Sequence, residues 1–431
     1  MIMKYSKTKF LTFFAIGFLL TSAFSLNDAF TYDGTTITVV DNLEHDTTYG
    51  TFNSLVQVDA DTYALAYEGA NNDGFISTFT ISADGSTITE VATLEHDTTL
   101  GTYNSLVQVD ADTYALAYAG ADNDGFISTF TISADGSTLT KVATLEHDTD
   151  NGTYNFLIQV DSNTYALAYT GANNDGFIST FTISADGSTI TEVASLEHDT
   201  TYGLNNSLVQ VDADTYALAY AGTDTDGFIS TFTISADGST ITEVATLEHD
   251  ITLGHDNSLV QVDADTYALA YRGANNDGFI STFTISADGS TITEVASLEH
   301  DTTYGLNNSL VQVDADTYAL AYAGTDTDGF ISTFTISADG STITEVATLE
   351  HDASYGRYNS FVQVDADTYA LAYEGAALDG FISTFTIDGS SSTFTEVASL
   401  EYEPTNGRNT SLVQVDADIY ALAYSGPDED G

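Results

Sequence analysis

Short runs rich in apolar residues alternate with polar gaps along the whole chain and predict β-strands. Residues 54–103 contain four such runs, at 54–58, 62–67, 75–81 and 87–94. β-Branched and aromatic residues fill the runs, whereas Asp, Gly and Asn fill the gaps between them. Because no stretch has a helical period, the pattern predicts an all-β protein.

The second of these runs has two unlike faces. Successive side chains of a strand point to opposite sides, so Tyr63, Leu65 and Tyr67 share one face while Ala64 and Ala66 share the other. A bulky face and a small face suit sheets that stack on copies of themselves. The pattern therefore predicts that each sheet packs its large side on the small side of its neighbour.

One unit of this kind is repeated along the chain. The tetrapeptide Leu-Glu-His-Asp recurs seven times at intervals of 51 residues, and Val-Gln-Val-Asp or a near equivalent recurs eight times. Four short antiparallel strands per period, in many copies, predict a β-propeller of eight blades, each buried against its neighbours. The repeated histidines are His45, His96, His147, His198, His249, His300 and His351, and Tyr402 stands at the eighth position.

The blade pattern resembles that of secreted microbial propeller repeats of the YVTN type. The resemblance rests on the order Ser-Leu-Val-Gln-Val, Tyr-Ala-Leu-Ala-Tyr, Asp-Gly, Phe-Ile-Ser-Thr-Phe-Thr-Ile, Asp-Gly and Ile-Thr-Glu-Val, which spans nearly all of the chain after its first segment. The Tyr-Val-Thr-Asn signature itself is missing. The resemblance therefore implies the propeller fold and no particular activity.

The two ends of the repeat array predict a composite blade. A lone fourth strand at 36–43 and lone first and second strands at 411–424 would combine if the ring closes. The third strand of that blade is the weak point, because residues 26–32 match its pattern poorly. The alternative is that the sequence is a fragment of a longer blade array.

The first 25 residues have the order of a secretory signal peptide. Three lysines, at positions 4, 7 and 9, precede an apolar run at 10–20, and Ala-Phe-Ser follows at 23–25. We therefore expect a signal peptide at 1–25, a propeller at 26–431 and a secreted or cell-surface protein; the alternative is an uncut N-terminal anchor. No later segment is long and apolar enough to span a membrane.

The net charge of the chain limits the classes of ligand that it can bind. The chain has 64 acidic residues against seven Lys and Arg, with a formal net charge of −57. Such a charge repels phosphate backbones and anionic lipids, which excludes nucleic-acid binding and electrostatic membrane docking. The absence of cysteine excludes disulfides, Cys-ligated zinc and a thiol nucleophile.

Sequence variation is concentrated in the loops of one rim. The loops between the second and third strands, and those from the fourth strand to the next blade, differ from repeat to repeat, whereas the opposite rim is nearly uniform. Loops carry binding residues more often than strands do, so the variable rim is the candidate ligand face; drift of unconstrained loops is the alternative. The candidate residues are Asn72, Asp73, Asp122, Asp124, Asp224, Asp226, His255, Arg272, Asp326, Asp328, Arg357 and Arg408.

Some of these loops resemble part of a calcium-binding loop. Asp-Xaa-Asp-Gly places hard oxygen ligands at alternate positions before a glycine turn, as a cation would require. The first and the distal ligands of a full loop are missing, and turn chemistry alone explains Asp-Gly. Calcium is the one cofactor that the sequence suggests, and its candidate ligands are Asp122, Asp124, Asp224, Asp226, Asp326 and Asp328.

Catalytic signals are weak in the sequence. One His per blade is too widely spaced for chelation, so each repeated His is expected to be hydrogen-bonded in a loop at the end of an outer strand. An enzyme should break its repeat at one place, yet the deviations His255, Arg272, Arg357 and Arg408 are scattered along the sequence.

These observations favour a binding or surface-interaction module over an enzyme. The expected partner is an extracellular protein or a glycan held by the variable rim. The alternatives are a propeller lyase or hydrolase that uses the central channel and a structural repeat protein of the cell envelope.

Overall fold

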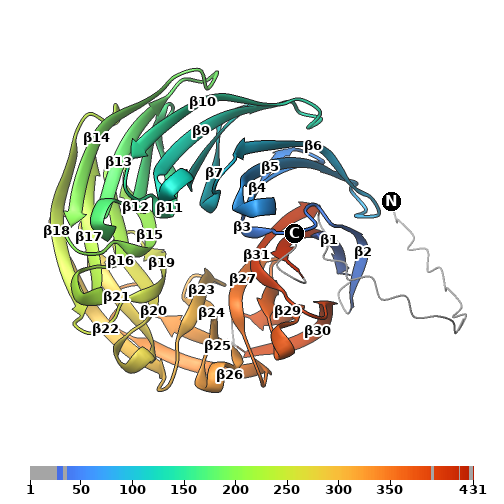
Figure 1. The fold of residues 1–431 in the computed structure, drawn as a ribbon. Helices are drawn as coiled ribbons and strands as arrows, with labels where there is room; N and C mark the ends of the chain where they lie inside the picture. The colour runs from blue at the N-terminus through green and yellow to red at the C-terminus, as the bar shows by residue number, and fades with distance from the viewer. Residues whose placement is uncertain (1–26, 33–35, 390–392, 417, 427–430) are drawn as a thin grey trace, which may run out of the picture.

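Eight four-stranded antiparallel sheets stand around a central channel, which confirms the predicted eight-bladed β-propeller (Figure 1). This computed structural model describes residues 27–32, 36–389, 393–416, 418–426 and 431. The predicted signal peptide at 1–25 lies outside the described residues. Within them, no helix has the length and apolar character needed to cross a bilayer.

Seven blades are continuous in sequence, and in each the first strand lies beside the channel and the fourth lies outermost. Blade 1 contains β3 (Thr51–Asp59), β4 (Thr62–Glu68), β5 (Gly74–Ile81) and β6 (Ile88–Asp97); blade 2 contains β7 (Thr102–Asp110), β8 (Thr113–Ala119), β9 (Gly125–Ile132) and β10 (Leu139–Asp148). Blade 3 contains β11 (Thr153–Asp161), β12 (Thr164–Thr170), β13 (Gly176–Ile183) and β14 (Ile190–Asp199); blade 4 contains β15 (Leu204–Asp212), β16 (Thr215–Ala221), β17 (Gly227–Ile234) and β18 (Ile241–Asp250). Blade 5 contains β19 (His255–Asp263), β20 (Thr266–Arg272), β21 (Gly278–Ile285) and β22 (Ile292–Asp301); blade 6 contains β23 (Leu306–Gln312), β24 (Thr317–Ala323), β25 (Gly329–Ile336) and β26 (Ile343–Asp352). Blade 7 contains β27 (Arg357–Gln363), β28 (Thr368–Glu374), β29 (Gly380–Asp388) and β30 (Thr393–Glu403).

A short 3-10 turn joins the second and third strands of each of these blades. Asp73 and its equivalents follow these turns and directly precede the third strand. The seven turns are η1 (Ala70–Asn72), η2 (Ala121–Asn123), η3 (Ala172–Asn174), η4 (Thr223–Thr225), η5 (Ala274–Asn276), η6 (Thr325–Thr327) and η7 (Ala376–Leu378).

Neighbouring blades pack large residues on small ones, as the sequence predicts. Tyr114, Leu116 and Tyr118 of blade 2 lie in one buried cluster with Ala64 and Ala66 of blade 1. The same arrangement recurs around the ring, and these tyrosines and alanines are fully buried. The hydrophobic core therefore lies between blades, and each blade depends on both neighbours.

The closing blade combines both ends of the described chain. Its strand order is β2 (Ile37–Leu43), β1 (Asn27–Tyr32), β32 (Ile419–Ser425) and β31 (Arg408–Asp416). The expectation that this blade lacks a good third strand is wrong, because β1 takes that place and pairs with β2 on one side and β32 on the other. The ring closes through this blade, contrary to the alternative of an open array.

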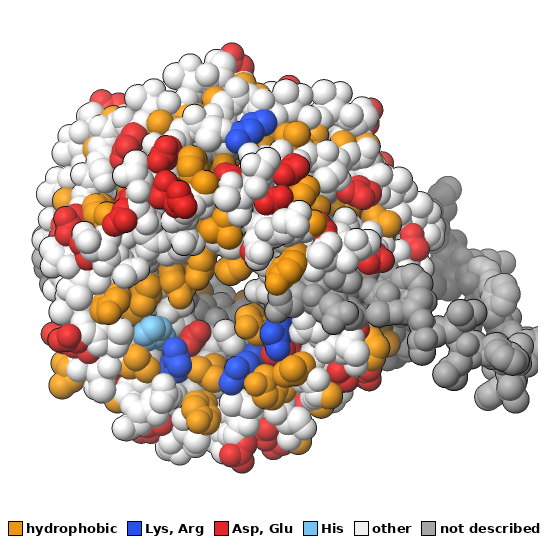
Figure 2. Space-filling model, in the orientation of Figure 1, with side chains coloured by type: hydrophobic (Ala, Val, Ile, Leu, Met, Phe, Trp, Pro, Cys, Tyr) orange, Lys and Arg blue, Asp and Glu red, His pale blue; other side chains and the backbone are white. Residues whose placement is uncertain are grey.

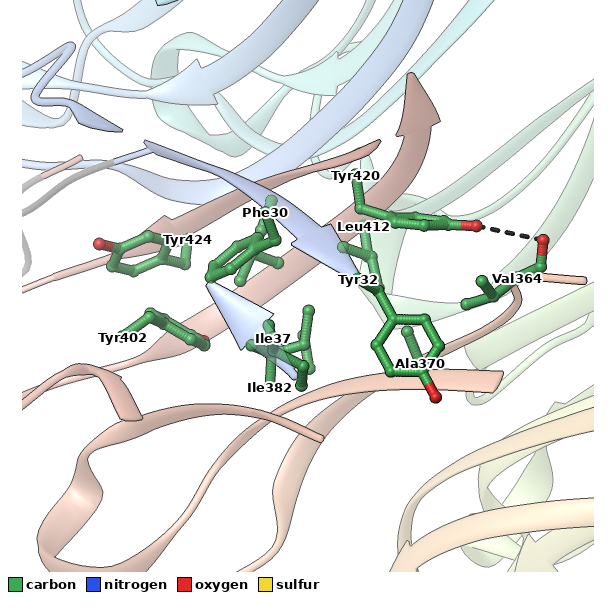
Figure 3. Close-up of a cluster of buried hydrophobic side chains, with 12 residues drawn as sticks. Phe30, Tyr32, Ile37, Val364, Ala370, Ile382, Tyr402, Leu412, Tyr420 and Tyr424 are labelled. Carbon is green, nitrogen blue, oxygen red and sulfur yellow. Dashed lines mark hydrogen bonds between the residues drawn. The ribbon is translucent and has the colours of Figure 1, made fainter. Parts of the chain in front are cut away.

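Phe30 and Tyr32 attach β1 to the blade beside it. Phe30 is 1% exposed and contacts the ring of Tyr402 edge-on at 6.0 Å between centroids. Both side chains point into a cluster with Tyr424 and Ile382, which come from the closing blade and blade 7 (Figure 3). Packing in this cluster therefore stabilises β1 as a strand, although its local sequence does not favour one.

Substitution of Phe30 by Ala should therefore loosen the ring closure. We expect a loss of about 3–5 kcal/mol in the free energy of unfolding, as for other buried Phe residues, together with faster amide hydrogen exchange in β31 and β32. Phe232→Ala, in the continuous blade 4, is the matched control and should leave exchange in the closing blade unchanged. Equal exchange in β31 and β32 of both variants would contradict this role.

Candidate functional site

The first strands of all eight blades begin at the channel with the same distorted backbone. The pairing of each first strand with the second shifts register here, for example between Thr51 and Ser54. The second residue of each first strand has a left-handed φ of 51–54°, which is uncommon for residues other than glycine. These eight residues form what we call the mouth ring: Phe52, Tyr103, Tyr154, Asn205, Asp256, Asn307, Tyr358 and Asn409.

Hydrogen bonds between blades hold the mouth ring in place. The amide of Asn104 donates to the carbonyl oxygen of Phe52 in the preceding blade at 3.2 Å and to that of Gly101 in its own blade at 2.9 Å. Equivalent bonds run around the ring, and in the closing blade the Thr410 hydroxyl takes the place of the amide. The backbone that presents the mouth-ring side chains is therefore fixed by both neighbours.

The mouth ring breaks the repeat, because its side chains differ between two arcs. Phe52, Tyr103 and Tyr154 make an aromatic arc, with ring centroids 4.7 and 4.8 Å apart. Farther around the channel, Asp256 takes the place of an aromatic ring, and further ionisable side chains of blade 5, blade 7 and the closing blade lie beside the mouth ring. This charged arc consists of His255, Asp256, Arg272, Arg357, Glu374 and Arg408.

Two cross-strand pairs build the charged arc. His255 at the start of β19 faces Arg272 at the end of β20, and Arg357 at the start of β27 faces Glu374 at the end of β28. Side chains paired in this way lie close together at one edge of the sheet. The hairpin register thus places all of them on the variable rim.

Two ion pairs orient the charged side chains. Arg272 Nε lies 3.0 Å from Asp256 Oδ2, and Arg408 Nε donates to Glu374 Oε1 at 2.6 Å. Arg357 lies between the two pairs, with its guanidinium carbon 4.8 Å from the centre of the Tyr355 ring. Within the described part of the chain, Nε of Arg357 is buried without a hydrogen-bond partner. This guanidinium therefore has donor capacity for a ligand.

Burial changes the pKa of three members of the arc. Burial raises the pKa of Asp256, against the opposing effects of Arg272 and Arg357. Burial likewise raises the pKa of Glu374, against Arg408 and Arg357. For His255, burial and the nearby Arg272 lower the pKa to about 4, so its imidazole is neutral at pH 7.

A cavity of about 330 Å³ opens at this part of the channel mouth. Asp256 and Tyr358 line it, together with asparagines from five neighbouring blades. The space-filling view shows basic side chains and a histidine gathered on one side of the central hollow, and hydrophobic side chains, a class that includes tyrosine, along its opposite border (Figure 2). The residues that deviate from the repeat are scattered along the sequence but not in space: His255, Arg272, Arg357 and Arg408 gather at one side of the channel mouth, where Arg272 pairs with the cavity residue Asp256.

The other predicted ligand-face residues lie farther out in the 3-10 turns. The amide of Asn72 donates to the buried Glu68 carboxylate at 2.7 Å, and Asp73 ends the same turn. Asp122 and Asp224 have left-handed φ values, which Asp tolerates in turns. This geometry supports turn formation for these residues.

The calcium candidates share these turns. Asp124 lies near Glu146, and this neighbour and burial raise its pKa. Asp226 and Asp328 are placed in the same way beside Glu248 and Glu350. In the part of the chain that the structure describes, no three His, Asp or Glu side chains converge as a metal site would require. Calcium binding by Asp122, Asp124, Asp224, Asp226, Asp326 and Asp328 stays a prediction.

The repeated histidines lie at the ends of the outer strands, as expected, and their ring nitrogens are buried. The expectation that they are hydrogen-bonded in loops is wrong for six of them and holds for His45, which bonds to the backbone of Gly431. The ring of His96 meets Tyr118 edge-on at 4.6 Å, and a Cβ added to Gly125 would lie 2.6 Å from the ring of His147. Among the described residues, both ring nitrogens of His96 and His147 lack a hydrogen-bond partner. These imidazoles therefore pack as neutral aromatic rings between blades.

A family model described as lactonase, 7-bladed beta-propeller, matches the chain at residues 113–265 and again at 163–419. No curated protein matches the sequence. The family match contradicts the expectation that the protein is not an enzyme, and it favours the alternative of a propeller hydrolase. The expected YVTN-type resemblance is confirmed only as far as the propeller fold.

Solved structures of similar fold include enzymes and a protein-binding propeller. The periplasmic gluconolactonase of Pseudomonas aeruginosa is 14% identical, with a TM-score of 0.56 over 93% of this chain and 99% of that chain. A Bacteroides fragilis protein assigned as a 6-phosphogluconolactonase is 16% identical, with a TM-score of 0.55 over 80% and 99%. Chaetomium thermophilum Sqt1, solved bound to the N-terminus of ribosomal protein L10, is 16% identical, with a TM-score of 0.61 over 88% and 98%. At these identities the likeness shows the fold alone.

Proposed function

We propose that this chain, which belongs to the family of lactonases with a 7-bladed beta-propeller, hydrolyses a sugar lactone at its charged arc. The observation that carries the proposal is the position of the arginines. The chain contains three, and all three belong to the charged arc, in a protein with a formal net charge of −57. A cluster of cations in such a chain is suited to an oxygen that becomes negative during reaction.

Lactone hydrolysis requires a base for water and a partner for the carbonyl oxygen. Water adds to the ester carbonyl, the bond from that carbon to the ring oxygen breaks, and the products are a hydroxyl group and a carboxylate. Asp256 lines the cavity, and its raised pKa makes it a stronger base than an ordinary carboxylate. We assign it to accept the proton of the attacking water.

Arg357 is assigned to the carbonyl oxygen. Within the described residues its Nε is buried without a hydrogen-bond partner, and its charge acts on the cavity side chain Asp256. A negative charge that develops on the carbonyl oxygen would pair with this guanidinium. His255 is neutral at pH 7 and is assigned to donate a ring N–H hydrogen bond to the departing ring oxygen, which takes up the proton that Asp256 removed from water. Arg272 and Arg408 act as positioning residues through Asp256 and Glu374.

Arg357→Gln tests this assignment. Hydrolysis of glucono-δ-lactone, followed by acid release in a pH-stat, should fall by about 10²–10³-fold in kcat, the usual effect of removing an oxyanion donor. Lys141→Gln, which removes a basic residue on the outer strand of blade 2 that donates to the carbonyl oxygen of His96, is the control and should retain the wild-type rate. Wild-type protein that hydrolyses no sugar lactone above the spontaneous rate, or equal rates for the two variants, would reject the proposal.

We also propose that the reaction takes place outside the cytoplasm. The signal-peptide pattern at 1–25 supports export, and the large negative charge suits an exported protein surrounded by counterions. The variable rim would then meet a lactone present in the extracellular or periplasmic fluid. Mass spectrometry of the protein secreted from cells that express the full sequence should find an N-terminus at Leu26.

A further inference from the structure

The aromatic arc borders a second cavity of about 460 Å³. Tyr103 and Tyr154 form its apolar wall, and Asp150, Asn151, Asn173 and Asn174 contribute polar groups. Cavities of about 300–1,000 Å³ are typical of small-molecule sites. This cavity is large enough for a ligand that needs both a flat apolar surface and several hydrogen-bond partners.

The repeat is broken at this cavity too. The position of Asn151 is occupied in six of the other blades by Tyr or Leu, as in Leu100 and Tyr202, and the position of Asp150 is occupied by Thr or Ser in all seven. The change from a bulky apolar side chain to Asn leaves space and supplies an amide. The Asn151 amide donates to Asn174 Oδ1 at 3.2 Å, which aligns the polar wall.

The second cavity adjoins the proposed catalytic cavity. Leu204 lines the second cavity and its neighbour Asn205 lines the first. The amide of Asn206, also in the first cavity, donates to the backbone oxygen of Tyr154 at 3.1 Å. A ligand held at the charged arc could therefore extend along the channel mouth onto the aromatic arc.

The chemistry of the second cavity selects a neutral sugar unit. A pyranose ring presents C–H groups on its face, which pack on tyrosine rings, and hydroxyl groups at its edge, which bond to amides and carboxylates. Burial raises the pKa of Tyr103 to about 12, so its ring stays uncharged. The Asp150 carboxylate and the overall negative charge disfavour a phosphate group.

From this juxtaposition we propose that the second cavity is a subsite for a neutral sugar residue, and that the substrate is an aldonolactone at the end of a short oligosaccharide. This inference rests on the proposed lactonase function for the position of the lactone ring. The lactone lies at the charged arc and the adjoining sugar stacks on Tyr103 and Tyr154.

The mouth ring supplies two matched substitutions that test the subsite. Tyr154→Phe keeps the ring, as Phe52 does at the equivalent position, and Tyr154→Asn removes it, as Asn205 does; all three positions have φ values of 51–54°. Cellobionolactone and maltobionolactone serve as disaccharide probes, and glucono-δ-lactone as the single-ring probe. The wild-type protein should prefer at least one disaccharide lactone by roughly tenfold in kcat/KM, a reasonable value for one aromatic stacking contact.

Tyr154→Asn should abolish that preference and leave glucono-δ-lactone hydrolysis unchanged, whereas Tyr154→Phe should retain it. Asn151→Leu, which introduces the residue of Leu100, should close the cavity with the same result as Tyr154→Asn. Hydrolysis of all three lactones at similar kcat/KM would overturn the subsite and leave the proposed function intact.

Calorimetric titration with cellobiose and maltose separates the two proposals. Binding of either disaccharide that is lost in Tyr154→Asn, without hydrolysis of any lactone, would keep the subsite and reject the lactonase function. Absence of both binding and a disaccharide preference would reject the subsite.

Discussion

Acidification to roughly pH 5 should unfold the protein, because the core contains seven buried histidines. Burial lowers the pKa of His96 to about 3 and that of His198 to about 4, from an ordinary 6.5. Below pH 6.5 these histidines are therefore protonated in the unfolded chain but not in the folded chain, so the free energy of unfolding falls as the pH falls. Each such histidine lowers the free energy of unfolding by up to about 1.4 kcal/mol per pH unit, so seven lower it by up to about 10 kcal/mol per pH unit. Between pH 6.5 and 5 this loss is comparable to the total stability of an ordinary domain, about 5–15 kcal/mol.

Carboxylates act on acid stability in two opposite directions. Hydrogen bonds in the outer turns lower the pKa of Asp84 to about 2, so its contribution is lost only well below pH 4. Burial raises the pKa of Glu192, so protonation of such groups favours the folded state and offsets part of the loss as the pH falls. The acid transition of the wild type therefore reports the balance between the histidines and these carboxylates.

Near-UV and far-UV circular dichroism from pH 7.5 to 4 would measure this transition. Tyr402 at the equivalent position shows that a six-membered ring fits there, so the double variant His198→Phe/His300→Phe should fold. It should lose about 2.8 kcal/mol less per pH unit than the wild type, and its acid midpoint should move to lower pH. An identical midpoint in the two proteins would mean that the buried histidines do not control acid stability.

The fold can be predicted from the sequence because the strand pattern of one blade recurs with each 51-residue repeat. Alternation in Tyr-Ala-Leu-Ala-Tyr predicts both faces of the second strand, and the structure packs Tyr114 and Tyr118 on the alanines of the preceding blade as expected. The third strand of the closing blade could not be predicted in this way. Residues Asn27–Tyr32 lack the apolar pattern of β5 (Gly74–Ile81) and become a strand because β2 and β32 offer two open edges.

The sequence predicts His255, Arg272, Arg357 and Arg408 as residues of the variable rim, but it does not predict that they form one site with Asp256 and Glu374, because these residues are distant in sequence. A signal for the shared site nevertheless exists. Within the 51-residue period, His255, Arg357 and Arg408 share the position of Thr51, whereas Arg272 and Glu374 share that of Glu68. Thr51 and Glu68 are partners across the hairpin of blade 1. Comparison of repeat positions therefore pairs His255 with Arg272 and Arg357 with Glu374, as the structure does, and adds Glu374 to the rim.

The pairing of Asp256 with the cavity could not be read from sequence. Its position in the repeat predicts the channel mouth, but its raised pKa depends on burial, and its orientation depends on Arg272. Burial and orientation arise from the closed ring, which brings blades 5 and 7 to the same cavity. The sequence therefore predicts where this carboxylate lies, whereas its pKa and its orientation can be obtained only from the structure.

Replacement of Asp256 by Asn should have the largest effect on catalysis. Asn occupies the same mouth-ring position at Asn205 and Asn307 with the same left-handed φ, so the substitution is compatible with the fold. Loss of the base should lower kcat for glucono-δ-lactone by about 10²–10⁴-fold at pH 7. The residual rate, after subtraction of spontaneous hydrolysis, should rise about tenfold from pH 7 to 8 because hydroxide then replaces the base, whereas the wild-type rate should stay level.

Arg272→Gln separates the base from its ion pair. This variant keeps the Asp256 carboxylate but removes the first of the cations that lower its pKa, so that pKa should rise further. More of the carboxylate is then protonated as the pH falls, so the loss of activity should be larger at pH 6.5 than at pH 8. The Asp256→Asn variant should instead lose most of its activity at both pH values.

A D256N protein that folds normally by circular dichroism and retains more than about a tenth of wild-type kcat would show that Asp256 is not the base. The proton acceptor would then have to be sought in Glu374, the other buried carboxylate of the charged arc with a raised pKa.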